Sequence, residues 1–325
     1  MKPSRRHVLA LALSAIAACA AAPAAAQGYP SKPITLVVAY PAGGDTDALA
    51  RLFGEKLSSR VSQPVVVDNK PGASGVIGSS FVARAPADGY TLLLAPSTFS
   101  IAQLVLKPGS AGYDVLNGFT PIIETGTLPL VLVASSGAGM KTFKDVAAAA
   151  KSGPLSYASP GSGSPMHILG ELVNKAAGID LRHVPYRGVA PAVNDVLGGH
   201  VPLTYITLGP VAPYLPAGKM VPLAVADSKR SPLAPNVPTF EELGYKGLQV
   251  GAWHGLFGPK GMPADIVKTL NAHFNEILKM PDVVARMETL GAIPLGGSPE
   301  TLAKTNAADY ERLGKVIKDL GIQAD

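Results

Sequence analysis

The sequence is poor in cysteine and in charge. Its 325 residues include a single cysteine, Cys19, which lies in a stretch of small and apolar residues near the N-terminus. The remainder of the chain therefore offers no disulfide and no thiolate, and its stability must come from packing. Only 16% of the residues are charged, and lysines and arginines are scattered without interleaved aromatics, so we expect no nucleic-acid partner.

Patterns that mark common enzyme classes are also missing. There is no Gly-x-Ser-x-Gly elbow, because the stretch from Gly161 to Ser164 runs directly into a proline. The sequence has no phosphate-binding loop ending in Gly-Lys-Ser/Thr, no Gly-x-Gly-x-x-Gly, and no metal-ligand spacing among its 6 histidines. We therefore expect no enzymatic activity, no metal and no cofactor. Because triads assemble from distant residues, a hydrolase that uses Ser164 and His167 is kept as an alternative.

Residues 1–26 have the pattern of an export signal. Basic residues precede an apolar run at 8–18 and a small-residue cleavage site at 24–26. The apolar run is too short to span a membrane, so we expect the segment to be removed on secretion to the periplasm. The basic residues of the segment are Lys2, Arg5 and Arg6. Because no acidic residue precedes position 27, the mature chain then carries a net charge of about +2.

Two other export routes remain open. The Ser-Arg-Arg sequence at 4–6, followed by two apolar residues, is similar to a twin-arginine signal. The Ile-Ala-Ala-Cys sequence at 16–19 is similar to a lipoprotein box, which would leave a lipid anchor on Cys19. The later site at 24–26 favours ordinary cleavage, with Gln27 as the first mature residue.

Hydrophobic residues make up 47% of the chain, enough for sizeable cores. From residue 27 onward, strand-like and helix-like segments alternate, and the strands are almost continuously apolar. This order predicts parallel strands in a sheet that helices cover on both faces. The expected strands of this first series are 34–40, 65–68 and 90–96, and the expected helices are 47–57 and 74–85.

A β-rich segment at 119–135 is too long for one ordinary strand, and it predicts a chain that leaves one sheet and enters another. A second α/β series follows, and the glycine-rich segment 250–258 is expected to return to the first sheet. The later expected helices are 143–151, 165–177, 190–197, 264–279, 282–290 and 299–320, and the later expected strands are 155–158, 181–186, 203–207 and 221–226. We therefore expect two α/β lobes, one formed by 27–125 with 229–325 and one inserted at 126–228.

The loop after the first expected strand is a candidate ligand-binding loop. In open parallel sheets, ligands bind beyond the carboxyl ends of the strands. Two adjacent glycines let the backbone approach a ligand, and the following helix presents unpaired N–H groups and positive partial charge. An anion can therefore bind there without lysine or arginine. The expected contributors are Tyr40, Pro41, Ala42, Gly43 and Gly44.

Asp47 lies near the start of the same helix and is included among the candidate site residues. Its carboxylate would repel an anionic ligand. We therefore expect its side chain to stabilise the helix start, or to form an ion pair with Arg51 four residues further on.

The loop at 159–167 is the second candidate. Ser164 suits the N-cap of the helix that follows, and Pro165 suits its first position. Capping needs one serine, and three serines within six residues predict a neutral cradle for an anion. We expect His167 to be neutral because it faces the positive end of the helix, with packing or capping as its main role. The expected contributors are Ser159, Gly161, Ser162, Gly163, Ser164 and His167.

Other strand ends are expected to complete the cleft. Ser97 and Thr98 follow the third strand, and Tyr186 ends a later one. Arg187 either neutralises a second carboxyl group or lies solvated at the strand end, and the solvated arrangement is the default. Trp253, the only tryptophan, either covers the ligand or packs at the hinge.

Six short motifs lie in order along the expected mature chain. They are Pro41-Ala42-Gly43-Gly44-x-x-Asp47-x-x-Ala50-Arg51, Asn69-Lys70-Pro71-Gly72-Ala73-x-Gly75, Asp88-Gly89-Tyr90-Thr91-Leu92, Gly161-Ser162-Gly163-Ser164-x-x-His167, Val184-Pro185-Tyr186-Arg187-Gly188 and Pro238-Thr239-x-x-Glu242-x-Gly244-Tyr245. In this order they resemble the extracytoplasmic receptors of tripartite tricarboxylate transporters, the Bug receptors.

The resemblance implies a type II periplasmic binding protein fold, with two α/β lobes that close on a ligand like a flytrap. It also implies a small organic carboxylate, bound by the loops at 40–44 and 162–167 with Tyr186 in support. The implied partner is a membrane permease with one large and one small subunit, and we expect the receptor itself to be a monomer. An orphan or sensory protein that presents its ligand to a signalling receptor is the alternative.

Two departures from the family pattern leave the ligand's identity open. The stretch at 97–103 replaces a small polar segment that often ends in Asn-Pro, and Pro202 stands where an acidic residue is common. Phe99 and its apolar neighbours, in the first of these stretches, hint at a less polar ligand, such as an aromatic acid.

Overall fold

The computed structural model describes residues 28–106 and 111–323. The expected signal at 1–26, and with it Cys19, lies outside the described residues. From Lys32 onward the chain forms one compact unit. Within the described residues, no helix combines the length and the apolar character that a membrane crossing requires.

The first sheet has six strands in the order β11-β4-β10-β3-β1-β2. They are β1 (Ile34–Val38), β2 (Val65–Asn69), β3 (Thr91–Pro96), β4 (Phe119–Leu128), β10 (Ala252–Pro259) and β11 (Ile293–Pro294). As predicted, β1 runs parallel to both β2 and β3. The sheet as a whole is mixed, because β10 runs antiparallel to β3 and β4 and β11 runs antiparallel to β4.

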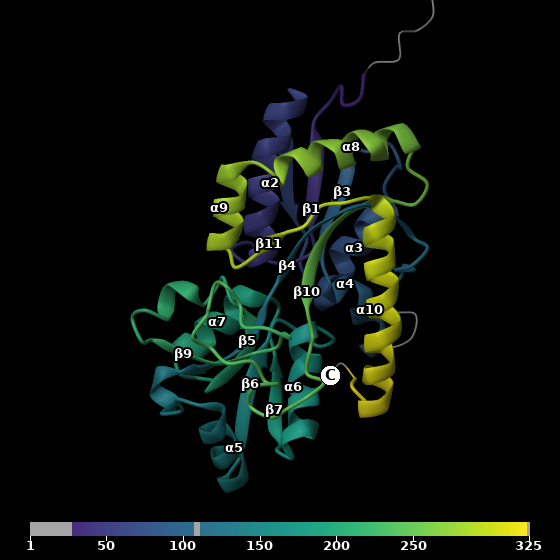
Figure 1. Cartoon of the computed structure of the whole chain (residues 1–325). Coiled ribbons are helices and arrows are strands. Elements are labelled where there is room, and N and C mark those ends of the chain that lie inside the picture. Colours follow the sequence, from purple (N-terminus) through teal and green to yellow (C-terminus); the bar gives the residue numbers. More distant parts are fainter. Residues whose placement is uncertain (1–27, 107–110, 324–325) are drawn as a thin grey trace, which may run out of the picture. The chain divides into compact units, whose positions relative to one another are not determined.

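The second sheet has five strands in the order β7-β6-β8-β5-β9. They are β5 (Leu130–Ser135), β6 (Leu155–Ser159), β7 (Leu181–Pro185), β8 (Leu203–Thr207) and β9 (Met220–Val225). Only Pro129 separates β4 of the first sheet from β5 of the second, so the segment 119–135 does pass from one sheet to the other (Figure 1). The exact residue limits expected for the two lobes stay a prediction.

Two groups of helices pack on the first sheet, α2 with α8 and α9 near one side, and α3 with α4 and α10 near the other (Figure 1). These helices are α2 (Asp45–Val61), α3 (Val76–Ala83), α4 (Thr98–Val105), α8 (Ala264–Ile277), α9 (Pro281–Thr289) and α10 (Pro299–Leu320). The helices of the second lobe are α5 (Phe143–Ser152), α6 (Pro165–Ala177) and α7 (Val189–Leu197). Short 3₁₀ turns occur at η1 (Ala73–Gly75), η2 (Ser136–Ala138) and η3 (Ala212–Tyr214).

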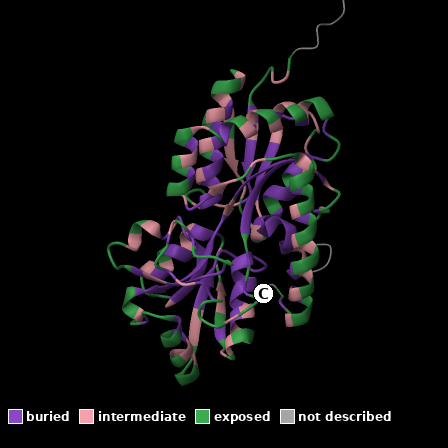
Figure 2. Cartoon of the chain, in the orientation of Figure 1, coloured by how far each residue is buried: buried purple, intermediate pink, exposed green. Residues whose placement is uncertain are grey.

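The apolar strands explain why helices cover both faces of the sheet. Val37 and Leu93 pack in one cluster with Phe99 of α4 and Leu302 of α10. Side chains alternate along a strand, so the neighbouring Leu36 points to the opposite face, and it is also buried. Figure 2 shows that the strands of both sheets are largely buried, with the exposed residues on the outer sides of the helices.

Two local predictions were wrong. The helix expected from residue 74 begins at Val76, because Ala73 and Ser74 have φ values of 46° and 51° and form a 3₁₀ turn first. These left-handed conformations are uncommon outside glycine and interrupt an α-helix. The stretch 97–103, for which no helix was expected, contains most of α4.

Candidate ligand-binding site

Four helices begin at one pocket between the two sheets. Their first residues, Asp45 of α2, Thr98 of α4, Pro165 of α6 and Val189 of α7, all line it. The first two helices belong to the first sheet and the last two to the second. Helix N-termini carry unpaired N–H groups and positive partial charge, so four such ends meet at the pocket, and the carboxylate of Asp45 already lies at that of α2.

The walls of this pocket are largely apolar, and the pocket is narrow. Pro41 and Pro160 face it from opposite lobes, together with Met166 and Pro191. Its volume is only about 30 Å³. None of the described residues that line it is a lysine or an arginine, so an anionic group bound there relies on helix ends and hydroxyl groups.

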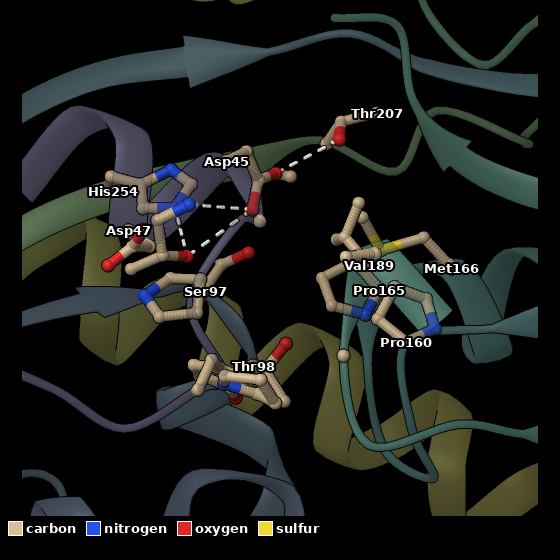
Figure 3. A pocket seen from close by; sticks show the side chains of 18 of the residues that line it. Asp45, Asp47, Ser97, Thr98, Pro160, Pro165, Met166, Val189, Thr207 and His254 are labelled. Atoms are coloured by element: carbon tan, nitrogen blue, oxygen red, sulfur yellow. Dashed lines mark hydrogen bonds between the residues drawn. The ribbon is translucent and has the colours of Figure 1, made fainter. Parts of the chain in front are cut away.

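Asp45 joins the two lobes across the pocket (Figure 3). One carboxylate oxygen, Oδ2, accepts the hydroxyl of Thr207, which ends β8, at 3.0 Å. The other, Oδ1, accepts the backbone N–H of Thr46 at 2.7 Å. Asp45 and Thr207 are buried, with exposed fractions of 8% and 1%. The carboxylate of Asp45 therefore lies at the N-terminus of α2, where a bound anion would also be stabilised.

His254 of β10 lines the pocket and supports this arrangement. Its Nε2 lies 2.8 Å from the hydroxyl oxygen of Thr46. Burial lowers the pKa of His254, although the nearby charge of Asp45 acts in the opposite direction, so the ring is neutral. Its Nδ1 is buried without a hydrogen-bond partner among the described residues. An unpaired acceptor is more common than an unpaired N–H, which favours a proton on Nε2, donated to Thr46.

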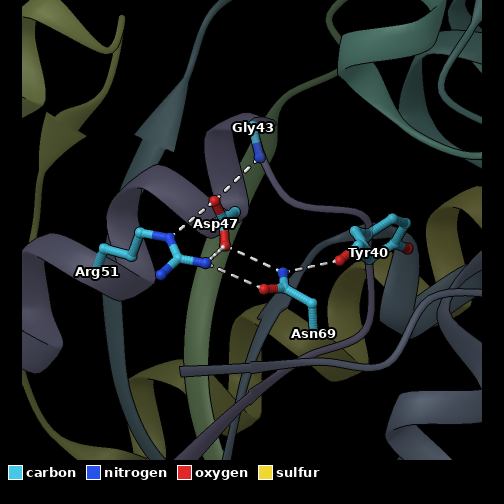
Figure 4. A network of polar contacts seen from close by, with 5 residues as sticks. All are labelled: Tyr40, Gly43, Asp47, Arg51 and Asn69. Carbon is cyan, nitrogen blue, oxygen red and sulfur yellow. Dashed lines mark hydrogen bonds and ion pairs between the residues drawn. The ribbon is translucent and has the colours of Figure 1, made fainter. Parts of the chain in front are cut away.

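Asp47 faces away from the pocket's centre and holds the first loop together (Figure 4). It forms the predicted ion pair with Arg51, whose Nη2 lies 2.9 Å from Oδ1. Its carboxylate also accepts the N–H of Gly43 at 3.0 Å and the amide of Asn69 at 3.0 Å. The same amide group donates to the carbonyl oxygen of Tyr40. Burial acts to raise the pKa of Asp47, but the hydrogen bonds from Arg51, Gly43 and Asn69 outweigh it and lower that pKa.

The serines of the second loop mainly fix its conformation. Ser164 caps α6, as predicted, by accepting the backbone N–H of His167 at 3.2 Å, and Pro165 occupies the first position of the helix. The ring Nδ1 of His167 accepts the N–H of Gly163 at 3.2 Å. The ring also stacks on His183, with the two centroids 3.8 Å apart. These contacts fit the packing and capping role expected for His167.

A second, wider pocket of about 330 Å³ lies beside the first and shares Tyr40 with it. Ser74 and Ser162 line it from opposite lobes, and the hydroxyl of Ser74 donates to the carbonyl oxygen of Ser162 at 3.0 Å. Tyr40 donates its own hydroxyl to the carbonyl oxygen of Ser74 at 3.0 Å. The two loops that the sequence singled out therefore meet through a short chain of hydrogen bonds.

The predicted site residues fall into three groups. Those that line the narrow pocket are Tyr40, Pro41, Gly44, Asp47, Ser97 and Thr98. Those that line the wider pocket are Tyr40, Gly161, Ser162 and Tyr186. Those that line neither are Ala42, Gly43, Ser159, Gly163, Ser164 and His167. Contact of any of these residues with a ligand stays a prediction.

The sequence analysis missed four polar residues at the pocket, namely Asp45, Thr46, Thr207 and His254. Asp45 and Thr46 occupy the first two of the four unassigned positions inside the first motif. Thr207 ends a strand whose limits were predicted, so the strand-end rule could have included it. No sequence pattern marked His254 as a site residue, apart from its position next to Trp253 in the segment 250–258.

Three further residues that the sequence analysis considered do not line the narrow pocket. Trp253 packs in the core of the first lobe and donates its indole N–H to Asp309 at 2.7 Å. Phe99 packs against Tyr113, Phe119 and Phe257 and lines neither pocket, so it gives no support to the expectation of a less polar ligand. Arg187 lines the wider pocket and is exposed, as expected for a solvated arginine at a strand end.

The fold and the pocket define a two-lobed binding protein of the periplasmic binding protein class. Two mixed α/β sheets hold a pocket between them, and loops of both contribute to it. The chain belongs to the tripartite tricarboxylate transporter family of receptors, because the family model described as "Tripartite tricarboxylate transporter family receptor" matches residues 49–322. This finding confirms the resemblance seen in the six sequence motifs.

Individual relatives agree with this assignment. The chain is 36% identical to Protein BugT of Bordetella pertussis over 303 residues, which cover 93% of each chain. It is similar to the structure of R. palustris Rpa4515 with adipate, with a TM-score of 0.87, 35% identity, and coverage of 91% of this chain and 99% of the other. It is also similar to MatC (Rpa3494) from Rhodopseudomonas palustris with bound malate, with a TM-score of 0.83, 32% identity, and coverage of 89% and 100%.

Proposed function

We propose that this protein is a periplasmic receptor that binds a small organic carboxylate between its lobes and delivers it to a tripartite tricarboxylate-type permease. The observation that carries the proposal is the meeting of four helix N-termini at one pocket. Such ends bind anions through backbone N–H groups. Because two of the helices come from each lobe, a carboxylate held by both stabilises the closed arrangement.

The ligands of two relatives support the chemical class. Adipate is bound in Rpa4515 and malate in MatC, and both molecules are small dicarboxylates. In the present chain no lysine or arginine lines the narrow pocket among the described residues. Neutral donors of this kind give modest affinity, which suits a receptor that must release its ligand to a permease.

Binding requires the lobes to separate first. The volume of about 30 Å³ is too small for an acid of four to six carbons, since it holds only about two to three water molecules at roughly 10–15 Å³ each by the same measure. The hydrogen bond from Thr207 to Asp45 joins the lobes at the narrow pocket, and the bond from Ser74 to Ser162 joins them at the wider pocket beside it. Both are single polar contacts, so the ligand can compete with them as it enters.

The serine and histidine that suggested a hydrolase are arranged for loop structure. Ser164 accepts the backbone N–H of His167, and the ring Nδ1 of His167 accepts the N–H of Gly163. Ser164 is only 1% exposed and lines neither pocket. This geometry supports binding without turnover as the role of the second loop.

The binding step is tested by thermal unfolding of the mature protein in the presence of small carboxylic acids. A ligand that binds only the folded state stabilises it by about 2.7 kcal/mol at 100 times its Kd, so the unfolding midpoint should rise with ligand concentration. The protein is first unfolded and refolded to remove any copurified ligand. A midpoint that no carboxylate changes after this step contradicts the proposal.

The delivery step needs a separate test. Cells that hold the permease subunits should take up the identified acid only when the receptor is present in the periplasm. A sensory receptor would bind the same acid without supporting uptake, so binding without uptake contradicts the transport part of the proposal alone. The expected signal at residues 1–26 is checked in the same cells by the mass of the periplasmic protein.

A further inference from the structure

The narrow pocket contains one carboxylate that no basic side chain neutralises. Asp45 lines the pocket as the first residue of α2 and is 8% exposed. No ion pair involves it in the part of the chain that the structure describes. The nearest ring, that of His254, is kept neutral by burial. The negative charge of Asp45 is therefore balanced only by helix ends and hydroxyl groups.

Asp47, unlike Asp45, has a basic partner. It lies two residues further along the same helix, but its carboxylate pairs with the guanidinium of Arg51 and with Asn69. Asp47 therefore adds little net charge to the pocket, and the uncompensated charge is that of Asp45.

Asp45 also retains unused capacity to accept hydrogen bonds. A carboxylate has about four acceptor positions. The described residues supply the Thr46 N–H at 2.7 Å, the Thr207 hydroxyl at 3.0 Å and a long contact with the Thr46 hydroxyl at 3.4 Å. A ligand group that donates a hydrogen bond can occupy a remaining position, whereas a ligand carboxylate placed there would meet a like charge at close range.

We infer that Asp45 selects a ligand that carries a carboxylate at one end and a nitrogen–hydrogen donor, an ammonium or an amide, at the other. This inference rests on the proposed function and narrows its ligand class. The donor end lies against Asp45 at the start of α2. The carboxylate end lies at the starts of α4, α6 and α7, which have no acidic residue in their first turns.

The test uses compounds of matched length that differ only at one end. The six-carbon set is adipate, its monoamide and 6-aminohexanoate, and the four-carbon set is succinate, its monoamide and 4-aminobutyrate. Calorimetry gives the affinity of each for the refolded wild-type protein and for Asp45→Asn and Asp45→Ser. Asp180→Asn, which removes an exposed carboxylate, is the matched control for loss of one negative charge.

We expect the wild-type protein to bind an amide or ammonium compound at least about tenfold more tightly than the dicarboxylate of the same length, which corresponds to a close like-charge repulsion. Asp45→Asn and Asp45→Ser should each shift this ratio about tenfold or more toward the dicarboxylate, and Asp180→Asn should leave it unchanged. Serine is a good helix N-terminal residue, so the second variant guards against misfolding of the first.

Two results overturn the inference. A wild-type preference for the dicarboxylate, or a ratio that neither Asp45 variant changes, contradicts the role of Asp45 but leaves carboxylate binding intact. Failure of every compound to bind any of the proteins contradicts the proposed function itself, and the inference with it.

Discussion

The hydrogen bond from Thr207 to Asp45 offers a direct test of how the closed arrangement is held. Thr207→Val keeps the shape of the side chain and removes the hydroxyl that donates to Oδ2 of Asp45 at 3.0 Å. Thr204→Val is a matched control on the same strand, because the hydroxyl of Thr204 donates to the carbonyl oxygen of Ala158 at 3.0 Å within the second lobe. Both threonines are essentially buried.

The expected magnitudes follow from the two acceptors. A hydrogen bond to a charged group contributes about 1.5–3 kcal/mol, and one between neutral groups about 0.5–1.5 kcal/mol. The bond of Thr207 exists only when the lobes are together, whereas the bond of Thr204 lies inside one lobe. Thr207→Val should therefore shift the ratio of open to closed molecules about 10- to 150-fold toward the open state. Thr204→Val should lower the free energy of unfolding without changing that ratio.

Energy transfer between two dyes reports the distance between the lobes. Cysteines introduced at Ser59 of α2 and Lys151 of α5 are exposed, and the expected mature chain has no other cysteine. Transfer should fall in Thr207→Val and stay at the wild-type level in Thr204→Val, both without ligand. Equal transfer in the two variants would refute the reasoning that the Asp45–Thr207 bond holds the lobes together.

Two further outcomes concern stability. Asp47→Ala should lower the free energy of unfolding in urea by about 2–4 kcal/mol, because the buried carboxylate accepts hydrogen bonds from Gly43 and Asn69 and pairs with Arg51. Arg51→Ala should cost less than about 1 kcal/mol, because it is a largely exposed partner, and equal losses would contradict this account. Burial and the neighbouring His167 lower the pKa of His183 from 6.5 to about 3. The unfolded chain therefore takes up a proton first as the pH falls, and stability present above pH 6.5 is lost toward pH 3, by at most about 1.4 kcal/mol per pH unit. His183→Gln should flatten this decline in urea titrations, and an unchanged slope would contradict it.

The local sequence determined most elements but not the direction of every strand. The helix at 165–177 and the strand at 203–207 have the predicted limits, because a serine cap, an N-terminal proline and apolar periodicity are all local signals. The antiparallel direction of β10 depends on the chain returning from the second sheet, which no local pattern specifies. The helix predicted at 74–85 starts late, at Val76, because the backbone at Ala73 and Ser74 is left-handed, and neither an alanine nor a serine indicates such a conformation in a sequence.

In the candidate site, too, local patterns predicted some residues and missed those that only the folded chain brings together. The strand-end rule led to the loops at 40–44 and 97–98, and residues of both line the narrow pocket. It could not bring Asp45 together with Thr207, because 162 positions separate them along the chain and they meet only when the two sheets face each other. Capping and ring contacts already use Ser164 and Ser159, so ligand contact of the second-loop serines stays a prediction.

The contacts between the lobes are of two kinds, and the difference between them indicates which contacts break when the pocket opens. At the pocket the lobes meet through two polar contacts, Thr207 with Asp45 and Ser74 with Ser162. In the first turn of α6, Ile168 is buried in an apolar cluster with residues of α4 and α10. Separating apolar side chains costs about 25 cal/mol for each Å² exposed, whereas water replaces a lost polar contact at a small net cost. We therefore expect opening to break the polar contacts at a smaller cost than the apolar ones, so that a ligand which replaces the two polar contacts closes the lobes again.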